Sequence, residues 1–305
     1  MDIPIDIFGK KLKNPLFLPS GIINDIPNHS MAVKAGVGSL VLKSITVDPR
    51  EGNPIPRIAK YDSGFINSVG LRNPGLTEAK KQIKLFLEKT NTPVIISVFA
   101  VKADDFQRLV YEFSELCPLA IELNLSCPNV SDEFGEILAN KADSSYKITK
   151  LAKKQAKNIP VISKLSPNTD NIGEIAKACE QAGADAVAAI NTVSQGMIID
   201  INKKRPVLGN GKGGVSGTGI KPIAVAKVYE IYEAVKIPIL GIGGISTWQD
   251  AVEMIMAGAS LIGIGSAVYE KGWNVYKDIL FGIKTYMEKT NISQIKNLIG
   301  AAHEK

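Results

Sequence analysis

Residues 119–130, LAIELNLSCPNV, carry the strongest signal in the sequence. The segment begins as an apolar strand and ends in a polar turn. The polar residues of the turn are Asn124, Ser126, Cys127 and Asn129, and Pro128 fixes the chain direction just after the sulfur. A thiol among hydrogen-bonding amides can act as a nucleophile or a proton acceptor. Free cysteines are also often buried for packing alone, so this segment by itself leaves both roles open.

Short apolar segments alternate with helical ones along the whole chain. Strands are expected at the start of 119–130 and at residues 15–19, 38–42, 93–99, 161–165, 185–190, 238–242 and 260–264. Helices are expected at residues 28–35, 76–90, 103–116, 144–157, 171–182, 222–235, 247–257 and 273–289, with Ser246 as the cap of 247–257. The apolar runs are continuous, as in parallel strands that are covered on both faces. The pattern predicts an α/β fold, a TIM (β/α)8 barrel, with an open doubly wound sheet as the alternative.

Three segments fall outside this alternation. Residues 3–13 predict an N-terminal β-hairpin that closes one end of the core. Residues 48–72 and 193–219 are polar insertions rich in proline or glycine, and we expect them at the face that carries the carboxyl ends of the strands. No linker divides the chain, so residues 1–305 are expected to form a single domain.

Composition is that of an ordinary globular protein, with 45% hydrophobic and 22% charged residues. The net charge of +6 is compatible with a polyanionic partner, but the lysines are spread over predicted helix faces, which suits a small anionic ligand equally well. The three cysteines lie far apart, which argues against disulfides and against a zinc or iron–sulfur site on this chain. The N-terminus resembles neither a signal peptide nor a membrane anchor, so we expect a cytoplasmic location.

Polar residues follow the predicted strands, where a (β/α) barrel carries its chemistry. They are Ser20, Lys43, Ser44, Ser97, Asn124, Cys127, Lys164, Asn191, Thr192, Gly243, Gly244, Gly265 and Ser266. Each has an ordinary structural explanation taken alone, such as a lysine at the rim or an asparagine in a turn. Lys164 is harder to explain in that way, because it lies inside an apolar strand and lysines are rarely buried without a partner. Together these residues predict a site at one mouth of the barrel.

The chemistry of these residues suggests the ligands. Gly243-Gly244 and Gly265-Ser266 follow the last two strands, where glycine turns and helix N-termini favour a phosphate, although ordinary βα turns also use glycine. Four amides, from Asn67, Asn124, Asn129 and Asn191, can read both donors and acceptors on a ring edge. With the lysines, they suggest a planar, anionic substrate. The two histidines lie outside this group, so a Ser-His-Asp or metal mechanism has little support.

A series of motifs in order along the chain is similar to a known family. They are KSIT, REGNPIPR, INSVGL, ELNLSCPN, VISKLSPN, AINT, GGVSGTGIKP, GIGGI and GIGSA, between about residues 14 and 272. Together they resemble dihydroorotate dehydrogenase, class 1 catalytic subunit, closest to the NAD-linked subclass 1B. The resemblance implies a single FMN-binding TIM barrel, one FMN per chain, that oxidises dihydroorotate to orotate in pyrimidine (UMP) biosynthesis.

The resemblance also implies roles for individual residues. Cys127 matches the base that takes the proton from C5 of the substrate while hydride passes from C6 to the flavin. Substrate-contacting positions match Lys43, Asn67, Val69, Gly70, Leu71, Asn124, Asn129, Asn191 and Thr192. Flavin-contacting positions match Ser20, Lys43, Ser44, Asn124, Lys164, Ile190, Gly217, Gly243, Gly244, Gly265 and Ser266. The loop after Asn129 is expected to cover the site and to carry the base.

The electron acceptor is less clearly indicated. Ser97 stands where the NAD-linked subclass usually has asparagine and the fumarate-linked subclass has serine, yet the loop after Cys127 lacks the VPGKPQ-like run of the fumarate-linked subclass. An NAD-linked enzyme would need a partner subunit with FAD and a 2Fe–2S cluster, and a homodimer or heterotetramer is expected. Quinone or another acceptor stays open. The alternative functions are a related flavin barrel acting on another dihydropyrimidine and a tRNA dihydrouridine synthase. A non-catalytic barrel is the weakest alternative, because it would leave costly polar groups in a core.

Overall fold

Eight parallel strands close into a barrel in the order β10-β15-β16-β3-β4-β7-β8-β9. The computed structural model describes residues 3–125 and 141–303. The barrel strands are β3 Leu16–Leu18, β4 Ser39–Val41, β7 Val94–Val98, β8 Ala120–Asn124, β9 Val161–Lys164, β10 Ala186–Ala189, β15 Ile239–Ile242 and β16 Leu261–Gly263. Each lies within a segment that was expected to be a strand. The predicted TIM barrel is therefore confirmed, and the open doubly wound sheet is wrong because the strand order closes on itself.

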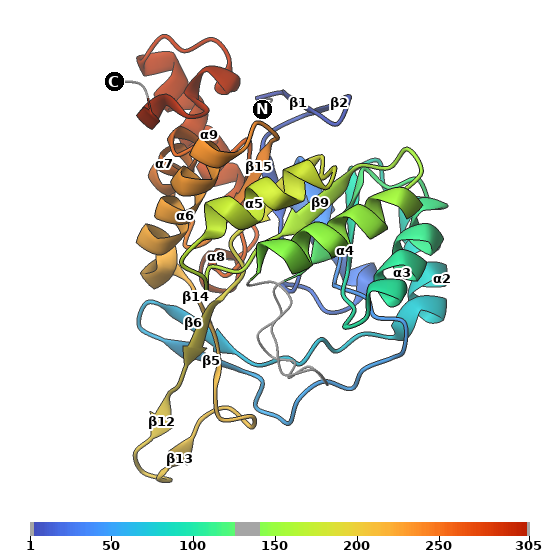
Figure 1. Ribbon diagram of the computed structural model, residues 1–305. Coiled ribbons are helices and arrows are strands. Elements are labelled where there is room, and N and C mark those ends of the chain that lie inside the picture. Colours follow the sequence, from blue (N-terminus) through green and yellow to red (C-terminus); the bar gives the residue numbers. More distant parts are fainter. Residues whose placement is uncertain (1–2, 126–140, 304–305) are drawn as a thin grey trace.

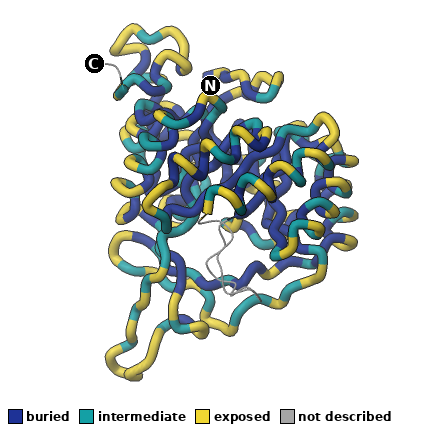
Figure 2. The backbone as a smooth tube through the Cα atoms, viewed as in Figure 1, coloured by how far each residue is buried: buried dark blue, intermediate teal, exposed yellow. Residues whose placement is uncertain are grey.

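Helices surround the barrel (Figure 1). They are α1 Ser30–Ala35, α2 Gly75–Leu87, α3 Ala103–Ser114, α4 Ala142–Gln155, α5 Ile172–Gln181, α6 Lys221–Ala234, α7 Trp248–Met256, α8 Ala267–Lys271 and α9 Val275–Lys289. Short 3₁₀ turns occupy Ile26–His29, Thr218–Ile220, Ile295–Leu298 and Ala301–His303. In α3, Phe106, Leu109, Val110 and Phe113 are buried at helical spacing, which places one apolar face against the strands. Figure 2 shows the same separation for the whole chain, with buried residues inside and exposed residues on the outer helix faces.

The start of α7 differs from the expectation by one residue. Thr247, not Ser246, is the N-cap: its side chain accepts from the Asp250 backbone N–H, and the Asp250 carboxylate accepts from the Thr247 N–H at 2.9 Å. This reciprocal pair is a capping box, which satisfies donors that the helix itself cannot. The serine was a reasonable choice from composition alone, because serine and threonine cap helices similarly well.

The two ends of the barrel carry different additions. The predicted N-terminal hairpin is confirmed as β1 Ile5–Ile7 paired with β2 Lys10–Leu12. In Figure 1 it lies at the same end as the C-terminal segment, with β12 and β13 at the opposite end. The hairpin therefore covers one end of the barrel and leaves the other end to the insertions.

The two insertions pair with each other at that opposite end. Strands β5 Ile58–Tyr61 and β6 Gly64–Asn67 come from the first insertion, and β11 Val193–Gly196 and β14 Gly213–Ser216 come from the second. They form one antiparallel sheet in the order β11-β14-β6-β5. Strands β12 Ile199–Asp200 and β13 Arg205–Pro206 extend from it as a small projecting hairpin (Figure 1). The sheet joins segments that lie about 150 residues apart in the sequence, as the pairing of Val215 with Ile66 shows.

Candidate active site

A pocket lies at the carboxyl ends of the barrel strands, beside the insertion sheet. With the exception of Ser97, its lining includes every predicted site residue that the structure describes, namely Ser20, Lys43, Ser44, Asn67, Val69, Gly70, Leu71, Asn124, Lys164, Ile190, Asn191, Thr192, Gly217, Gly243, Gly244, Gly265 and Ser266. Cys127 and Asn129 lie outside the described residues. The structure thus brings the predicted residues together, and which of them contacts a cofactor and which a substrate stays a prediction. The space between the lining atoms, including the open mouth, is about 1220 Å³.

Aromatic and aliphatic side chains form one wall of the pocket. Phe65 of β6 and Tyr269 of α8 pack with ring centroids 5.6 Å apart, and both line the pocket. The Tyr269 hydroxyl donates to the Ile22 carbonyl, and burial raises the pKa of Tyr269 above its usual value. These contacts connect the insertion sheet to the segments after β3 and β16. They give the pocket an apolar wall of the kind that accommodates a ring system.

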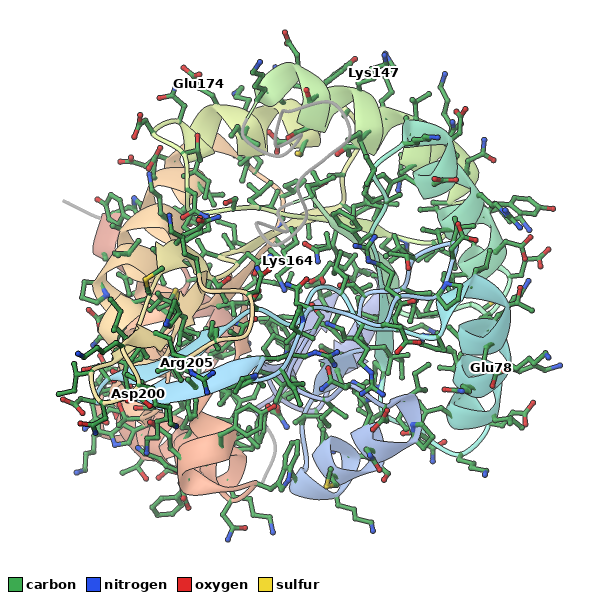
Figure 3. The ribbon with its side chains drawn as sticks, turned by 90° about the horizontal axis from the view of Figure 1, so that it is seen from below. Glu78, Lys147, Lys164, Glu174, Asp200 and Arg205 are labelled. Atoms are coloured by element: carbon green, nitrogen blue, oxygen red, sulfur yellow. The ribbon has the colours of Figure 1, made fainter. Side chains whose placement is uncertain are left out.

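Two lysines are the only charged side chains among the described lining residues. Lys43 and Lys164 are 6% and 5% exposed, and no aspartate or glutamate accompanies them in that lining. Figure 3, viewed from below, shows Lys164 inside the ring of helices, whereas Glu78, Lys147 and Glu174 lie toward its outside. Positive charge held in a partly enclosed space favours an anionic ligand, as the sequence predicted.

Lys164 is held by a hydrogen-bonded group beneath the pocket. Its Nζ donates to Ser20 Oγ at 3.0 Å. Ser20 Oγ in turn donates to Glu122 Oε1 at 3.1 Å, and Lys164 Nζ lies 3.9 Å from the same oxygen. Glu122 is fully buried on β8, two residues before Asn124, so both side chains point to the barrel interior. A lysine inside an apolar strand therefore has a buried acidic partner.

A second run of hydrogen bonds leads from Glu122 to the predicted amides. Ser97 Oγ donates to Glu122 Oε1 at 2.8 Å, and it lies 2.9 Å from Ser44 Oγ. Asn124 Nδ2 donates to Ser44 Oγ at 3.1 Å, and Asn191 Nδ2 donates to Asn124 Oδ1 at 3.4 Å. Ser97 was expected at the mouth, but it is fully buried and is absent from the pocket lining. It acts beneath the pocket as a link between the carboxyl group and the amides.

The glycine turns at the other side of the pocket are tightly constrained. Gly244 has φ of +73°, and a Cβ there would lie 2.7 Å from the Lys221 backbone nitrogen. Gly217 has φ of +105°, and a Cβ there would collide with the Gly64 Cα. Both positions therefore require glycine on two grounds, conformation and space. Their bare backbone is what a phosphate needs for close approach.

The N-terminus of α7 contributes less to such a site than the sequence suggested. Asp250 Oδ2 accepts from the Ser246 N–H at 3.0 Å and from the Thr247 N–H at 2.9 Å, so those two donors are occupied. Burial alone would raise the pKa of Asp250, but the bonds from Ser246, Lys221 and Thr247 outweigh it and lower the pKa. An anion in this region would therefore depend on the glycine turns rather than on the first turn of α7.

Glu122, Phe65 and Tyr269 were not predicted as part of the site. Glu122 was visible in LAIELN as an acidic residue inside an apolar run, two residues before Asn124 and therefore on the same face of the strand. The reasoning that singled out Lys164 applies to it equally. Phe65 and Tyr269 carried no such signal, since aromatic residues at those positions are ordinary packing residues.

The described residues contain neither a cluster of metal-ligating side chains nor a helix that could span a membrane. No group of three or more histidine, cysteine, aspartate or glutamate side chains in the described part could hold a metal ion. Within the same ranges, no helix is both long enough and apolar enough to cross a membrane.

Comparison with known proteins identifies the family. The model of the dihydroorotate dehydrogenase family matches residues 3–287. The dihydroorotate dehydrogenase B (NAD(+)) catalytic subunit of Pyrococcus abyssi is 43% identical over 98% of this chain and 99% of its own length. The subunit of the same name from Pyrococcus furiosus is 42% identical over the full length of this chain and of its own. The one from Brachyspira hyodysenteriae is 41% identical over 98% of this chain and 98% of its own length. The chain therefore belongs to the dihydroorotate dehydrogenase family, oxidoreductases that convert dihydroorotate to orotate in pyrimidine biosynthesis.

Proposed function

We propose that the pocket holds one FMN and that dihydroorotate is oxidised beside it, with Cys127 as the base. The observation that carries this proposal is the convergence of the predicted residues on one pocket from seven of the eight barrel strands and from the insertion sheet. A pocket with two buried lysines, hydrogen-bonding amides, an apolar wall and glycine turns offers a partner to each part of a flavin nucleotide.

The residues present fit FMN on chemical grounds. The apolar wall formed by Ile22, Phe65 and Tyr269 suits a hydrophobic ring edge. The constrained backbone at Gly217 and Gly244, with Gly265 and Ser266, suits a phosphate. Ser20, Ser44 and Lys164 would hold the polar edge of the ring, where a cation stabilises negative charge. When bound, FMN supplies the hydride acceptor for the reaction.

The amides would bind and orient the substrate. Asn124 and Asn191 are bonded to each other, and Asn67 Nδ2 donates to the Gly214 carbonyl at 3.4 Å across the insertion sheet. Such support reduces the freedom that these amides lose when they bind a ring edge. Lys43 would pair with the negative charge of the substrate. The prediction that Asn129 completes this set concerns a residue outside the described ranges.

Cys127 would take the proton from C5 as hydride leaves C6. Asn124 lines the pocket, and Cys127 is only three residues further along the chain. A thiolate is a suitable base near neutral pH because the usual pKa of cysteine, about 8.5, is close to that of the medium. The C5–H bond electrons form the new ring double bond as the C6 hydride departs, so the substrate loses two electrons and two hydrogens in all.

We further propose that electrons leave through a partner subunit carrying FAD and a 2Fe–2S cluster, with NAD as the final acceptor. The support is the similarity to relatives that are catalytic subunits of NAD-linked dihydroorotate dehydrogenases. A heterotetramer of two such pairs, or a homodimer of this chain alone, is the expected assembly. A cytoplasmic location accords with Cys117 and Cys179, which are both free.

The first experiment is titration of the apoprotein with FMN, followed by an acceptor screen. One FMN per chain should bind, with quenched flavin fluorescence. The loaded chain alone should pass electrons to a dye, and NAD should be reduced only after the partner is added. Binding of no FMN by folded protein would overturn the proposed site, and direct reduction of NAD by the isolated chain would overturn the proposed partner. Reduction of fumarate by the chain alone would show that fumarate, and not NAD, is the electron acceptor.

A further inference from the structure

Glu122 is a buried acidic residue to which neither the family resemblance nor the comparisons assign a role. Its side chain has no exposure to solvent, and it lies on β8 beneath a pocket whose described lining contains two lysines and no acid. The interiors of such barrels are usually filled by branched apolar side chains. A carboxyl group in this position is costly to bury and needs an explanation.

One carboxylate oxygen of Glu122 makes all of the hydrogen bonds and the ion pair that this side chain has among the described residues. Oε1 accepts from Ser20 and Ser97 and lies 3.9 Å from Lys164 Nζ. Oε2 has no hydrogen-bond partner among the described residues. The geometry thus aims the carboxyl group at the lysine and its serine.

Fold stability does not explain this arrangement. Replacing a buried ion pair by apolar residues of similar volume is often neutral or stabilising. Removing only one partner, in contrast, leaves an uncompensated charge and is strongly destabilising. Glu122 and Lys164 are therefore expected to depend on each other, and the gain must lie in what the pair does for the pocket.

We propose that Glu122 is a positioning residue that holds Lys164 Nζ at the base of the pocket, directly and through Ser20, and offsets part of the positive charge that the pocket presents to a bound ring. This inference rests on the proposed function, because the ring is that of a flavin. A buried Lys164 without this counter-charge would strongly favour a flavin that has gained negative charge on reduction. Glu122 moderates that preference, so that the reduced flavin can still give its electrons away.

The first test is the flavin midpoint potential of Glu122→Gln, measured by anaerobic equilibration with a reference dye. The amide keeps an oxygen that can accept from Ser20 and Ser97 but removes the charge. We expect the ratio of reduced to oxidised flavin at a fixed potential to rise at least tenfold, which for a two-electron couple is about 30 mV. Ser97→Ala is the matched control, since it removes one bond to the same oxygen and leaves the charge. A potential in Glu122→Gln that moves no further than in Ser97→Ala overturns the proposal.

The second test needs no flavin, so it stands even if the proposed function fails. Urea unfolding of the apoprotein is compared for wild type, Glu122→Gln, Lys164→Met and the double variant. Lys164→Met alone should raise the unfolding constant at least a hundredfold, because it leaves Glu122 without a counter-charge. The unfolding constant of the double variant should be at least tenfold smaller than that of Lys164→Met. Additive effects would overturn the pairing.

Folding failures are also informative in this design. If Glu122→Gln does not fold but the double variant does, the mutual dependence of the pair is supported. If neither folds, Glu122 is a structural residue and the proposal is wrong. A wild-type chain that binds no FMN, but shows the coupling in apoprotein, would contradict the proposed function and leave the pairing of Glu122 with Lys164 intact.

Discussion

Tyr276→Phe should weaken the turn that begins the Gly265-Ser266 side of the pocket. Tyr276 is 1% exposed on α9, and its hydroxyl donates to the Ile264 carbonyl at 2.7 Å. Burial raises the pKa of Tyr276 well above its usual value, so the hydroxyl stays a donor throughout the stable pH range. The variant loses that hydrogen bond and leaves a buried carbonyl without it, which together cost about 2 kcal/mol. For a chain of this length, that corresponds to a melting temperature lower by about 3 °C.

The assay is thermal and urea unfolding of the apoprotein, combined with FMN affinity from fluorescence quenching. FMN should bind several-fold more weakly, because the carbonyl precedes two residues of the pocket lining. Tyr286→Phe is the matched control on the same helix. Its hydroxyl makes no hydrogen bond within the described residues, so a change below about 0.5 kcal/mol is expected. A Tyr276→Phe protein as stable as this control would refute the assigned role of the hydrogen bond.

Three further predictions concern other parts of the chain. Gly244→Ala should lower both stability and FMN affinity, since φ is +73° and the Lys221 backbone blocks a Cβ. Gly9→Ala is the control, because its φ of +70° in open space gives the backbone strain alone. Equal losses of stability in the two variants, measured by calorimetry, would refute the close approach of the Lys221 backbone to Gly244. Burial lowers the pKa of His29, so on acidification the unfolded chain binds a proton at a higher pH than the folded chain does. The stability of the protein should therefore fall as pH drops below about 6.5. A His29→Leu variant whose urea midpoint depends on pH as steeply as that of the wild type would contradict this. Cys127→Ala should lose about 10²- to 10⁴-fold in kcat while it keeps flavin, and Cys127→Ser should need higher pH; unchanged turnover in the alanine variant would place the base elsewhere.

Local sequence patterns were sufficient to predict the barrel. Strands such as Val94–Val98 and Ala120–Asn124 are buried along their whole length, so continuous apolar runs identified them without knowledge of their neighbours. The residues of the pocket followed from the same reasoning, because parallel strands deliver their carboxyl ends to one face.

The insertion sheet could not be predicted in this way. Strands β6 and β14 contain several glycines and little apolar alternation, and their stability comes from pairing with each other across about 150 residues. Such pairing depends on where the barrel places both segments, which no local window contains. The Thr247 cap was missed for a smaller reason, since only the position of Asp250 distinguishes it from Ser246.

Glu122 shows a different limit. Its acidic side chain interrupts an apolar strand, but the partners that explain it lie on other strands. Ser97 is on β7, Lys164 is on β9 and Ser20 follows β3. The sequence indicates that such a residue is unusual, and only the closed barrel indicates what it touches.

The most direct test of the central claim is anaerobic mixing of the FMN-loaded protein with dihydroorotate, followed by visible absorbance. The flavin should bleach in the first turnover, and one orotate should appear for each flavin reduced. A folded, flavin-loaded protein that stays yellow with saturating dihydroorotate would contradict the assignment of this pocket as the site of dihydroorotate oxidation.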